Sequence, residues 1–252
     1  MKKYNFNAVV KSVRRYSSGL LHLTLVYDNM PEMSPGQFVE VRVDKAPVLL
    51  NRPISIFNRT DKELELLVSP VGVATKELCN YRPGDKLGIV GPLGRGFSID
   101  FNPGTKVLLV GGGVGIAPLY YLSRILKENN VDVEIIYGSR TAPDKEICAM
   151  FEDVAPLHVC TDDGSAGFHG LVTAHPVFAV KHDFVQICGP KPMMKACARL
   201  TAGLGVETEV SLENHMACGI GACLCCVEDT VDGNVCVCKN GPVFNTKLLK
   251  WM

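Results

Sequence analysis

The sequence predicts a chain of three parts: a small β-barrel over residues 1–100, a doubly wound α/β domain over residues 101–212, and a short cysteine-rich segment over residues 213–252. Three observations lead to this division. Short β-rich runs separated by turn residues fill the first hundred residues, as in small barrels. Buried strands then alternate with helices, as in doubly wound sheets. Six of the eleven cysteines lie between residues 218 and 238.

Five short runs account for the predicted barrel. We expect its strands over residues 8–14, 20–27, 37–43, 53–57 and 63–69, and a helix over residues 74–80. Turn residues separate each run from the next, and this spacing favours a closed or nearly closed sheet.

Two polar motifs in the barrel suit contacts to phosphate and to a ring edge. Arg52 opens the run Arg52-Pro53-Ile54-Ser55, where its guanidinium offers a fork that matches a diphosphate and Ser55 offers a hydroxyl. Gly72 precedes the expected helix, which includes Thr75, and free N–H groups at a helix start can bind phosphate. Either motif alone fits a surface arginine or an ordinary turn better than a binding site.

The second part alternates strands and helices. We expect strands over residues 107–110, 133–137, 157–161, 184–188 and 207–212, and helices over residues 117–128 and 193–201. The first strand ends in Gly111, Gly112, Gly113 and, after Val114, Gly115. Glycines at this place let a pyrophosphate approach the backbone closely. Their spacing is not G-x-G-x-x-G, so by themselves they are weak evidence.

The cysteine-rich segment has the spacing C-x4-C-x2-C, followed after eleven residues by a fourth cysteine. This is the plant-type arrangement for a 2Fe–2S cluster. Glycines 219 and 221 let the loop curl through left-handed backbone conformations. A structural zinc site and paired disulfides are the alternatives, but zinc sites usually use two well-separated pairs. The predicted ligands are Cys218, Cys223, Cys226 and Cys238.

Two further cysteines compete with this set. Cys236 and Cys238 are expected on the same face of a strand, so periodicity does not choose between them. Cys238 is preferred because it directly precedes a turn over residues 239–242 that would aim its side chain inward. Cys225 and Cys236 are then expected to be buried small apolar residues. His215 would be needed as a ligand only if one thiolate were missing.

Composition excludes several classes of protein. With 26 basic and 26 acidic residues, the chain offers no electrostatic basis for binding nucleic acid. The N-terminal residues lack the apolar stretch of a signal peptide, and no apolar run reaches the roughly 18 residues that cross a membrane. An odd number of cysteines prevents complete disulfide pairing. We therefore expect a cytoplasmic protein in a reducing compartment.

The order of the motifs resembles the ferredoxin–NADP reductase superfamily. It runs from Arg52-Pro53-Ile54-Ser55 and the turn at Gly72 through the segment 91–97 and the glycine-rich strand end to Cys188-Gly189-Pro190. With the cysteine segment, which ends in Gly-Pro-Val-Phe at 241–244, the chain is similar to the electron-transfer subunits of type B dihydroorotate dehydrogenases.

The resemblance implies FAD in the barrel, NAD(H) as co-substrate in the second domain and a 2Fe–2S cluster in the tail. It places Arg52 on the FAD diphosphate, with Pro53 and Ile54 beside the flavin and Ser55 near its N5 atom. Plant-type reductases carry an aromatic residue in place of Ile54. The remaining implied contacts are Gly72 and Thr75 for the FAD phosphates, and Gly111, Gly112, Gly113 and Gly115 for the dinucleotide. Cys188, Gly189 and Pro190 would lie where nicotinamide meets flavin, and Ser55 and Cys188 are the candidate catalytic residues.

The implied function is electron transfer between NAD(H), FAD, the cluster and the FMN of a separate dihydroorotate dehydrogenase subunit, in de novo pyrimidine (UMP) biosynthesis. The implied assembly is a heterotetramer with two chains of each kind. One alternative is a reductase subunit of a sulfide, sulfite or ferredoxin-linked NAD(P)H oxidoreductase. Another is a zinc-stapled regulatory domain that senses dinucleotides. A visible absorption spectrum distinguishes this zinc-containing domain from the two reductases, since flavin and the cluster are coloured and zinc is not.

Overall fold

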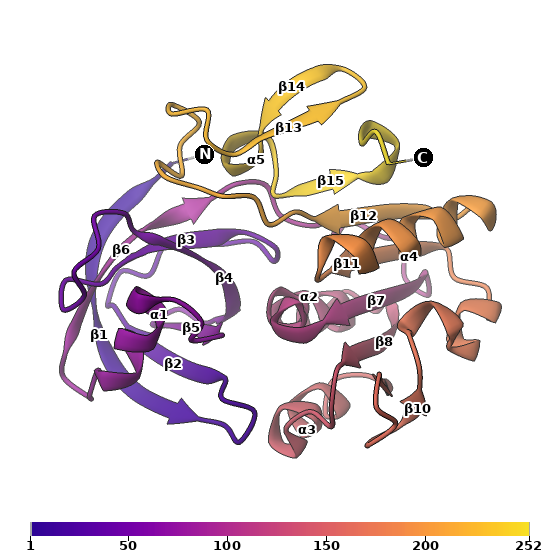
Figure 1. Cartoon of the computed structure of the whole chain (residues 1–252), viewed down its shortest axis with the longest axis horizontal. Helices are drawn as coiled ribbons and strands as arrows, with labels where there is room; N and C mark the ends of the chain where they lie inside the picture. Colours follow the sequence, from indigo (N-terminus) through magenta and orange to yellow (C-terminus); the bar gives the residue numbers. More distant parts are fainter. Residues whose placement is uncertain (1, 252) are drawn as a thin grey trace.

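The computed structural model describes residues 2–251, in which a closed β-barrel packs beside a mainly parallel sheet (Figure 1). The barrel strands follow one another around the barrel in the order β1-β2-β5-β4-β3-β6. Their bounds are β1 Tyr4–Arg15, β2 Leu21–Val26, β3 Phe38–Arg42, β4 Arg52–Arg59, β5 Glu63–Val68 and β6 Lys86–Leu93. The short helices α1 Val73–Glu77 and η1 Leu78–Asn80 connect β5 to β6.

All five predicted barrel strands are present, and the structure adds β6 as a sixth. This strand was missed because two glycines, Gly88 and Gly91, weaken its strand pattern. Each glycine lies against a side chain of the neighbouring strand β3. A Cβ atom on Gly88 would lie 2.9 Å from the guanidinium of Arg42, and one on Gly91 would lie 2.7 Å from Cγ1 of Val39. The glycines therefore allow close packing of side chains across β6.

The second domain contains a seven-stranded sheet in the order β10-β9-β8-β7-β11-β12-β15. The first six are β7 Lys106–Gly112, β8 Asp132–Ser139, β9 Leu157–Thr161, β10 Phe168–His169, β11 Phe184–Cys188 and β12 Glu207–Ser211. Its helices are η2 Gly113–Ile116, α2 Ala117–Glu128, α3 Lys145–Glu152, η3 Val172–Ala174, η4 Pro176–Ala179 and α4 Lys191–Gly203. Within residues 2–251 no helix is long and apolar enough to cross a membrane.

Alternate residues of β7 pack on opposite faces of the sheet. Val107 and Leu109 belong to the apolar core that includes α2 and α3, whereas Leu108 and Val110 belong to the core that includes α4. A strand buried on both faces reads as a continuous apolar run, which is why 107–110 was predictable. The helices thus cover both faces, as predicted for a doubly wound sheet.

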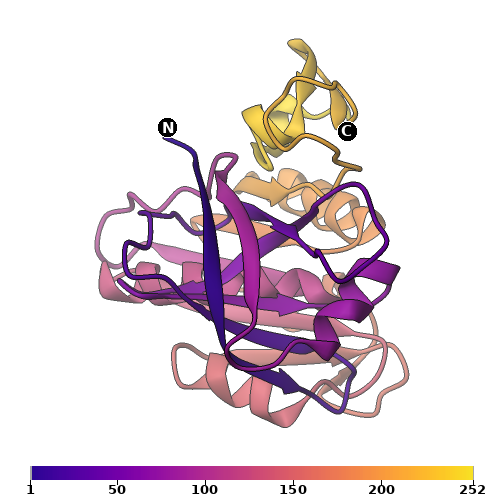
Figure 2. The same cartoon turned by 90° about the vertical axis from the view of Figure 1, so that its left-hand side faces the viewer.

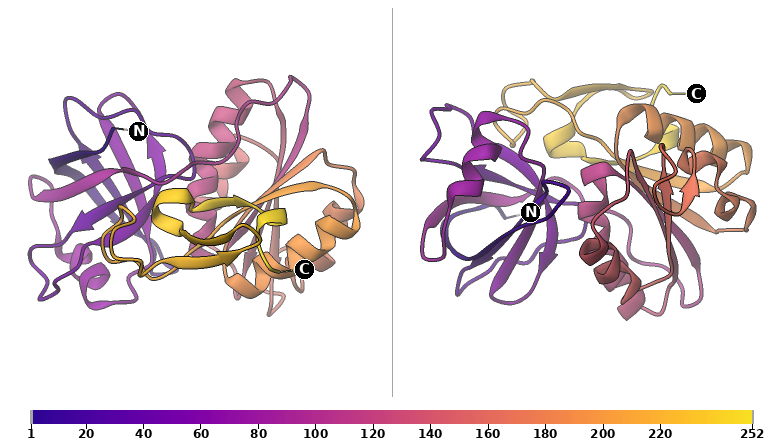
Figure 3. Two further views of the ribbon diagram at one scale, coloured as in Figure 1. Left: turned by 90° about the horizontal axis from the view of Figure 1, so that it is seen from above. Right: turned by 60° about the horizontal axis from the view of Figure 1, so that its bottom comes forward.

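The C-terminal segment adds the edge strand β15 Val243–Asn245, which pairs antiparallel with β12. Before it come the hairpin β13 Val227–Thr230 and β14 Gly233–Cys236, and the helix α5 Val237–Asn240. After it, η5 Thr246–Leu248 leads to the buried Leu249 and Trp251. Figures 2 and 3 show this segment, in yellow, lying across the barrel and the sheet. The division of the chain at residue 212 stays a prediction.

Helix α2 joins the second domain to the barrel. The ring of Tyr120 stacks on Phe57 of β4 with centroids 4.7 Å apart, and the hydroxyl of Tyr121 donates to the carbonyl oxygen of Met33 at 3.1 Å. Arg124 donates through Nη1 to Oδ1 of Asn58 at 2.7 Å. These contacts turn β4, the strand that begins at Arg52, toward the second domain.

Candidate functional site

The predicted cluster ligands form two pairs of contacting thiols. Cys223 donates to the sulfur of Cys218, and Cys238 donates to the sulfur of Cys226. Two pairs are what a two-iron cluster requires, since each iron takes two protein thiolates. Among the described residues no three Cys, His, Asp or Glu side chains are arranged to hold one metal ion. The pairing of the four thiols therefore fits a 2Fe–2S cluster.

Backbone N–H groups point at the first of these sulfurs. Gly219 and Gly221 have φ values of +62° and +82°, as the spacing predicted, and this curl directs N–H groups inward. The amides of Ala222 and Cys223 lie 3.3 and 3.4 Å from Sγ of Cys218. Burial raises the pKa of this thiol, but hydrogen bonds from Ile220, Cys223 and Ala222 outweigh burial and lower it to about 6. Cys218 is thus held as a thiolate, the form that binds iron.

The second pair is deeper. Cys226 and Cys238 are each 1% exposed, and the backbone amide of Cys238 donates to Sγ of Cys226 at 3.4 Å. Burial first, then the hydrogen bond and the charge of Cys226, raise the pKa of Cys238 to about 12. Bound iron would instead lower the pKa of both thiols, because a cation stabilises the two thiolates.

The structure corrects two expectations about the remaining cysteines. Cys236 and Cys238 do not share a strand, because β14 ends at Cys236 and Cys238 lies in α5. The expectation that Cys225 is buried is wrong, since its side chain is exposed, and Cys236 is only half-buried. The helical turn after Cys236 carries Cys238 into the apolar core shared with Cys226. The alternation of side chains expected along a strand does not predict a helical turn at this place.

The barrel motifs lie on β4 and α1. Arg52 is the first residue of β4, and its Nη1 donates to the carbonyl oxygens of Leu50 and Asn51 at 3.1 and 2.9 Å. Thr75 Oγ1 accepts from the N–H of Gly72 at 2.9 Å and donates to its carbonyl oxygen at 3.1 Å. Thr75 therefore stabilises the turn before α1, a structural role that was not predicted beside its phosphate contact.

The two dinucleotide motifs lie side by side at the carboxyl ends of neighbouring parallel strands. Cys188 of β11 is opposite Gly111 of β7 in the register. A Cβ atom on Gly115 would lie 2.6 Å from the carbonyl oxygen of Cys188, and one on Gly112 would lie 2.5 Å from Sδ of Met193. The glycines let the two loops touch at the edge where doubly wound sheets bind nucleotides.

One glycine of this turn leaves room beside the backbone. Gly113 has a φ of +54°, and a Cβ atom placed there would meet no other atom within 4 Å. The open space at Gly113 is the feature of the turn that fits close approach of a dinucleotide. Glycines 111, 112 and 115 are explained by packing inside the chain.

Cys188 has a neutral thiol. Burial, with a smaller contribution from Glu213, raises its pKa to about 12, and a hydrogen bond with Ser211 opposes this only in part. A neutral thiol is a poor nucleophile and a poor base at physiological pH. Any role for Cys188 in hydride transfer is therefore one of positioning.

Sequence reasoning missed Glu40 at this site. Glu40 is 3% exposed on β3, where it is opposite Pro53 of β4. Its Cγ atom would lie 2.9 Å from a Cβ atom on Gly219 of the cluster loop. Burial and then the charge of Cys218 raise its pKa to about 7, although Arg52 lowers it. The signal in the sequence is a single acid in the run Phe38-Val39-Glu40-Val41, which is otherwise apolar.

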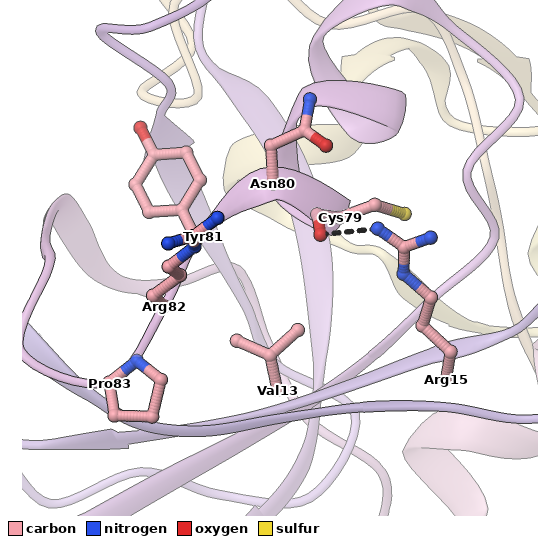
Figure 4. Close-up of a pocket in the computed structure, with 7 residues that line it drawn as sticks. All are labelled: Val13, Arg15, Cys79, Asn80, Tyr81, Arg82 and Pro83. Carbon is pink, nitrogen blue, oxygen red and sulfur yellow. Dashed lines mark hydrogen bonds between the residues drawn. The ribbon is translucent and has the colours of Figure 1, made fainter.

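A hollow on the barrel lies apart from these residues (Figure 4). It has a volume of about 660 Å³, and Arg15 donates across it to the carbonyl oxygen of Cys79. Its lining residues are Val13, Arg15, Cys79, Asn80, Tyr81, Arg82 and Pro83. None of the predicted cofactor residues is among them, so the candidate site is defined by the motifs and their geometry.

Comparison with known proteins adds three findings. Residues 213–250 match the model of the iron–sulfur cluster binding domain of dihydroorotate dehydrogenase B. The electron transfer subunit of dihydroorotate dehydrogenase B (NAD(+)) from Clostridium acetobutylicum is 37% identical over 243 residues, covering 96% of each chain. The same subunit from Listeria monocytogenes is 37% identical over 235 residues, covering 90% of this chain and 92% of that one.

A solved structure is similar over nearly the whole chain. It is that of an NADH-dependent reduced ferredoxin-NADP oxidoreductase, studied for flavin-based electron bifurcation, with a TM-score of 0.84 and 30% identity. The match covers 97% of this chain and 90% of that one. The likeness therefore includes the barrel, the sheet and the cysteine-rich segment together.

Proposed function

Because this chain belongs to the family of electron transfer subunits of dihydroorotate dehydrogenase B (NAD(+)), we propose that it connects NAD(H) to the FMN of a separate dihydroorotate dehydrogenase chain in pyrimidine biosynthesis. When bound, FAD would exchange a hydride with NAD(H), and the 2Fe–2S cluster would pass single electrons. The observation that carries the proposal is the position of the cluster loop. Gly219 lies over Glu40, and Glu40 is directly opposite Pro53 in the predicted flavin motif.

On the barrel side, we assign Arg52 to the FAD diphosphate and Ser55 to the edge of the flavin near N5. Pro53 and Ile54 lie between them on β4 and form the wall beside the ring. Gly72 and Thr75 hold the turn at which the FAD phosphates would lie. The stacking of Tyr120 on Phe57 supports this assignment, because it orients β4 toward the domain that would bring the nicotinamide.

On the sheet side, the glycine turn would hold the dinucleotide and the loop after β11 would limit the position of the nicotinamide. The residues are Gly111, Gly112, Gly113, Gly115, Cys188, Gly189 and Pro190. Hydride transfer needs no general acid or base, so the work of these residues is to place one ring against the other. The protonated state of Cys188 supports this assignment, since the thiol adds no charge beside the ring.

The tail would hold the cluster through Cys218, Cys223, Cys226 and Cys238 and present it to the partner. On the same loop, Ile220 is 45% exposed and Leu224 is 65% exposed. Exposed apolar side chains at such a position suit a protein interface. We assign them to the contact with the FMN-containing subunit, in a heterotetramer of two chains of each kind. The free cysteines suit the cytoplasm.

The structural likeness to a ferredoxin-linked oxidoreductase favours one second candidate, a reductase subunit with a different acceptor. Its barrel, sheet and cluster would be used in the same way, so only the partner distinguishes it. Co-purification of the chain from its native cell separates the two. Recovery of an FMN-containing dihydroorotate dehydrogenase chain supports the first candidate, and recovery of a different redox protein alone supports the second.

Arg52→Ala is expected to weaken FAD binding by roughly 10- to 150-fold. The change removes a charge-assisted contact to phosphate, worth about 1.5–3 kcal/mol. Titration of the flavin-free chain with FAD, followed by flavin fluorescence, measures the loss. Arg14→Ala is the matched control, because Arg14 is an exposed arginine of the barrel that pairs with Glu146. Equal FAD affinity in the parent and in Arg52→Ala would contradict the assignment of this motif.

Gly115→Ala is expected to lower kcat/KM for NADH by roughly 10- to 100-fold, because a displacement of about 1 Å near a reacting ring can cost that much. The new methyl would push the carbonyl of Cys188 away. Dye reduction by the FAD-loaded chain measures the effect. Gly203→Ala is the control, since a Cβ atom there meets nothing within 4 Å. Unchanged NADH kinetics in folded Gly115→Ala would contradict the assignment of this loop to the nicotinamide site.

A further inference from the structure

Glu40 is a buried carboxyl group between the two predicted cofactor sites. It is 3% exposed, and neither of its carboxyl oxygens has a hydrogen-bond partner among the described residues. A buried carboxyl without a partner is costly, and native proteins rarely keep one unless it has a task. Phe38, two residues before it on the same face of β3, is a buried apolar residue.

The side chain of Glu40 faces the cluster loop. Val39 and Val41 belong to the barrel core, whereas Phe38, like Glu40 on the alternate face of β3, belongs to the core that contains Cys226 and Cys238. A Cβ atom on Gly219 would lie 2.9 Å from Cγ of Glu40 and 3.0 Å from Oε1. The cluster loop therefore covers the carboxyl and shields it from water.

The charges of both sites reach Glu40. Burial raises the pKa of Glu40 most, the charge of Cys218, the first predicted ligand, raises it further, and the charge of Arg52, the predicted partner of the FAD diphosphate, lowers it. Glu40 is opposite Pro53 across the β3–β4 ladder, so the same residue touches the flavin strand and the cluster loop. Interactions between charges are strong here because little water screens them.

We propose that Glu40, through the negative charge of its carboxylate, lowers the reduction potential of the cluster. This inference rests on the proposed function. When one electron moves from reduced flavin to the oxidised cluster, the flavin loses that electron, the cluster gains one negative charge, and no atom is transferred. A carboxylate beneath the loop repels the added charge and so favours the oxidised cluster.

The test is a spectroscopic redox titration of the FAD-loaded and cluster-loaded chain in one mildly alkaline buffer. In Glu40→Gln, the ratio of reduced to oxidised cluster at a given solution potential is expected to rise about tenfold, which is about 59 mV for a one-electron couple. Glu40→Asp keeps the charge and is expected to stay close to the parent. Glu152→Gln, which removes an exposed carboxylate on α3, is the control and is expected to leave the potential unchanged.

A parent-like cluster potential in Glu40→Gln with full iron content would overturn the proposal. If Glu40→Gln does not hold the cluster, Glu40→Met is titrated in its place, with the same expectation. Loss of the cluster in both, with retention in Glu40→Asp, would mean that the carboxyl builds the site and does not tune it, which also overturns the proposal. Failure of the proposed function is a separate result, since the parent chain would then lack flavin or cluster absorption, or would co-purify with a different redox protein.

Discussion

A cluster-free variant is expected to lose NADH-driven reduction of the partner's FMN, down to the background rate, while it keeps NADH-driven reduction of a small dye. Cys223→Ser removes the exposed one of the two thiols in the outer pair, in which Cys218 is half-buried, and leaves the buried pair of Cys226 and Cys238 in place. A dye can take electrons at the flavin. The partner would depend on the loop that carries Ile220 and Leu224 on its exposed side.

The measurement compares the two activities in one preparation, with FAD content and folding matched to the parent, because metal loss can unfold a small metal-binding segment. Cys225→Ser is the matched control, since Cys225 is exposed in the same loop and is not a predicted ligand. Undiminished transfer to the partner by a folded, FAD-loaded and cluster-free chain would show that the cluster is structural. It would also remove the central step of the proposed function.

Cys238→Ser is expected to abolish the cluster, whereas Cys236→Ser is expected to keep about two irons and two sulfides per chain. Cys238 is buried against Cys226 and its backbone amide donates to that sulfur. Cys236, two residues earlier at the end of β14, donates through its thiol to the carbonyl oxygen of Gly221 at 3.9 Å. Iron and sulfide analysis after anaerobic purification, with the visible spectrum, distinguishes the two variants.

The same two variants could also contradict the assignment of Cys238 as the fourth ligand. A normal spectrum in Cys238→Ser together with cluster loss in Cys236→Ser would transfer the fourth ligand position to Cys236. That result would require α5 to turn when the cluster binds, because Cys238 now lies inside the apolar core.

Local features of this molecule follow from the sequence because they depend on residues close together in the chain. The C-x4-C-x2-C spacing with glycines at 219 and 221 predicts the curled loop, and the structure has the left-handed φ values that it requires. The apolar run 107–110 predicts a strand buried on both faces, and Leu108 and Leu109 do pack on opposite sides of the sheet. Residue type and spacing within about ten positions determine such features.

Only the tertiary structure places the cluster loop against β3, about 180 residues away in the chain, where Gly219 covers Glu40. Only the tertiary structure adds β15 to the edge of the sheet and turns Cys238 inward on α5. Contacts between distant segments depend on which apolar faces meet when the chain folds, and a local pattern shows that a face is apolar without showing what covers it. Glu40 illustrates the difference: in the sequence it is one acid in a strand, and only in the folded chain is it shielded from water and without a hydrogen-bond partner among residues 2–251.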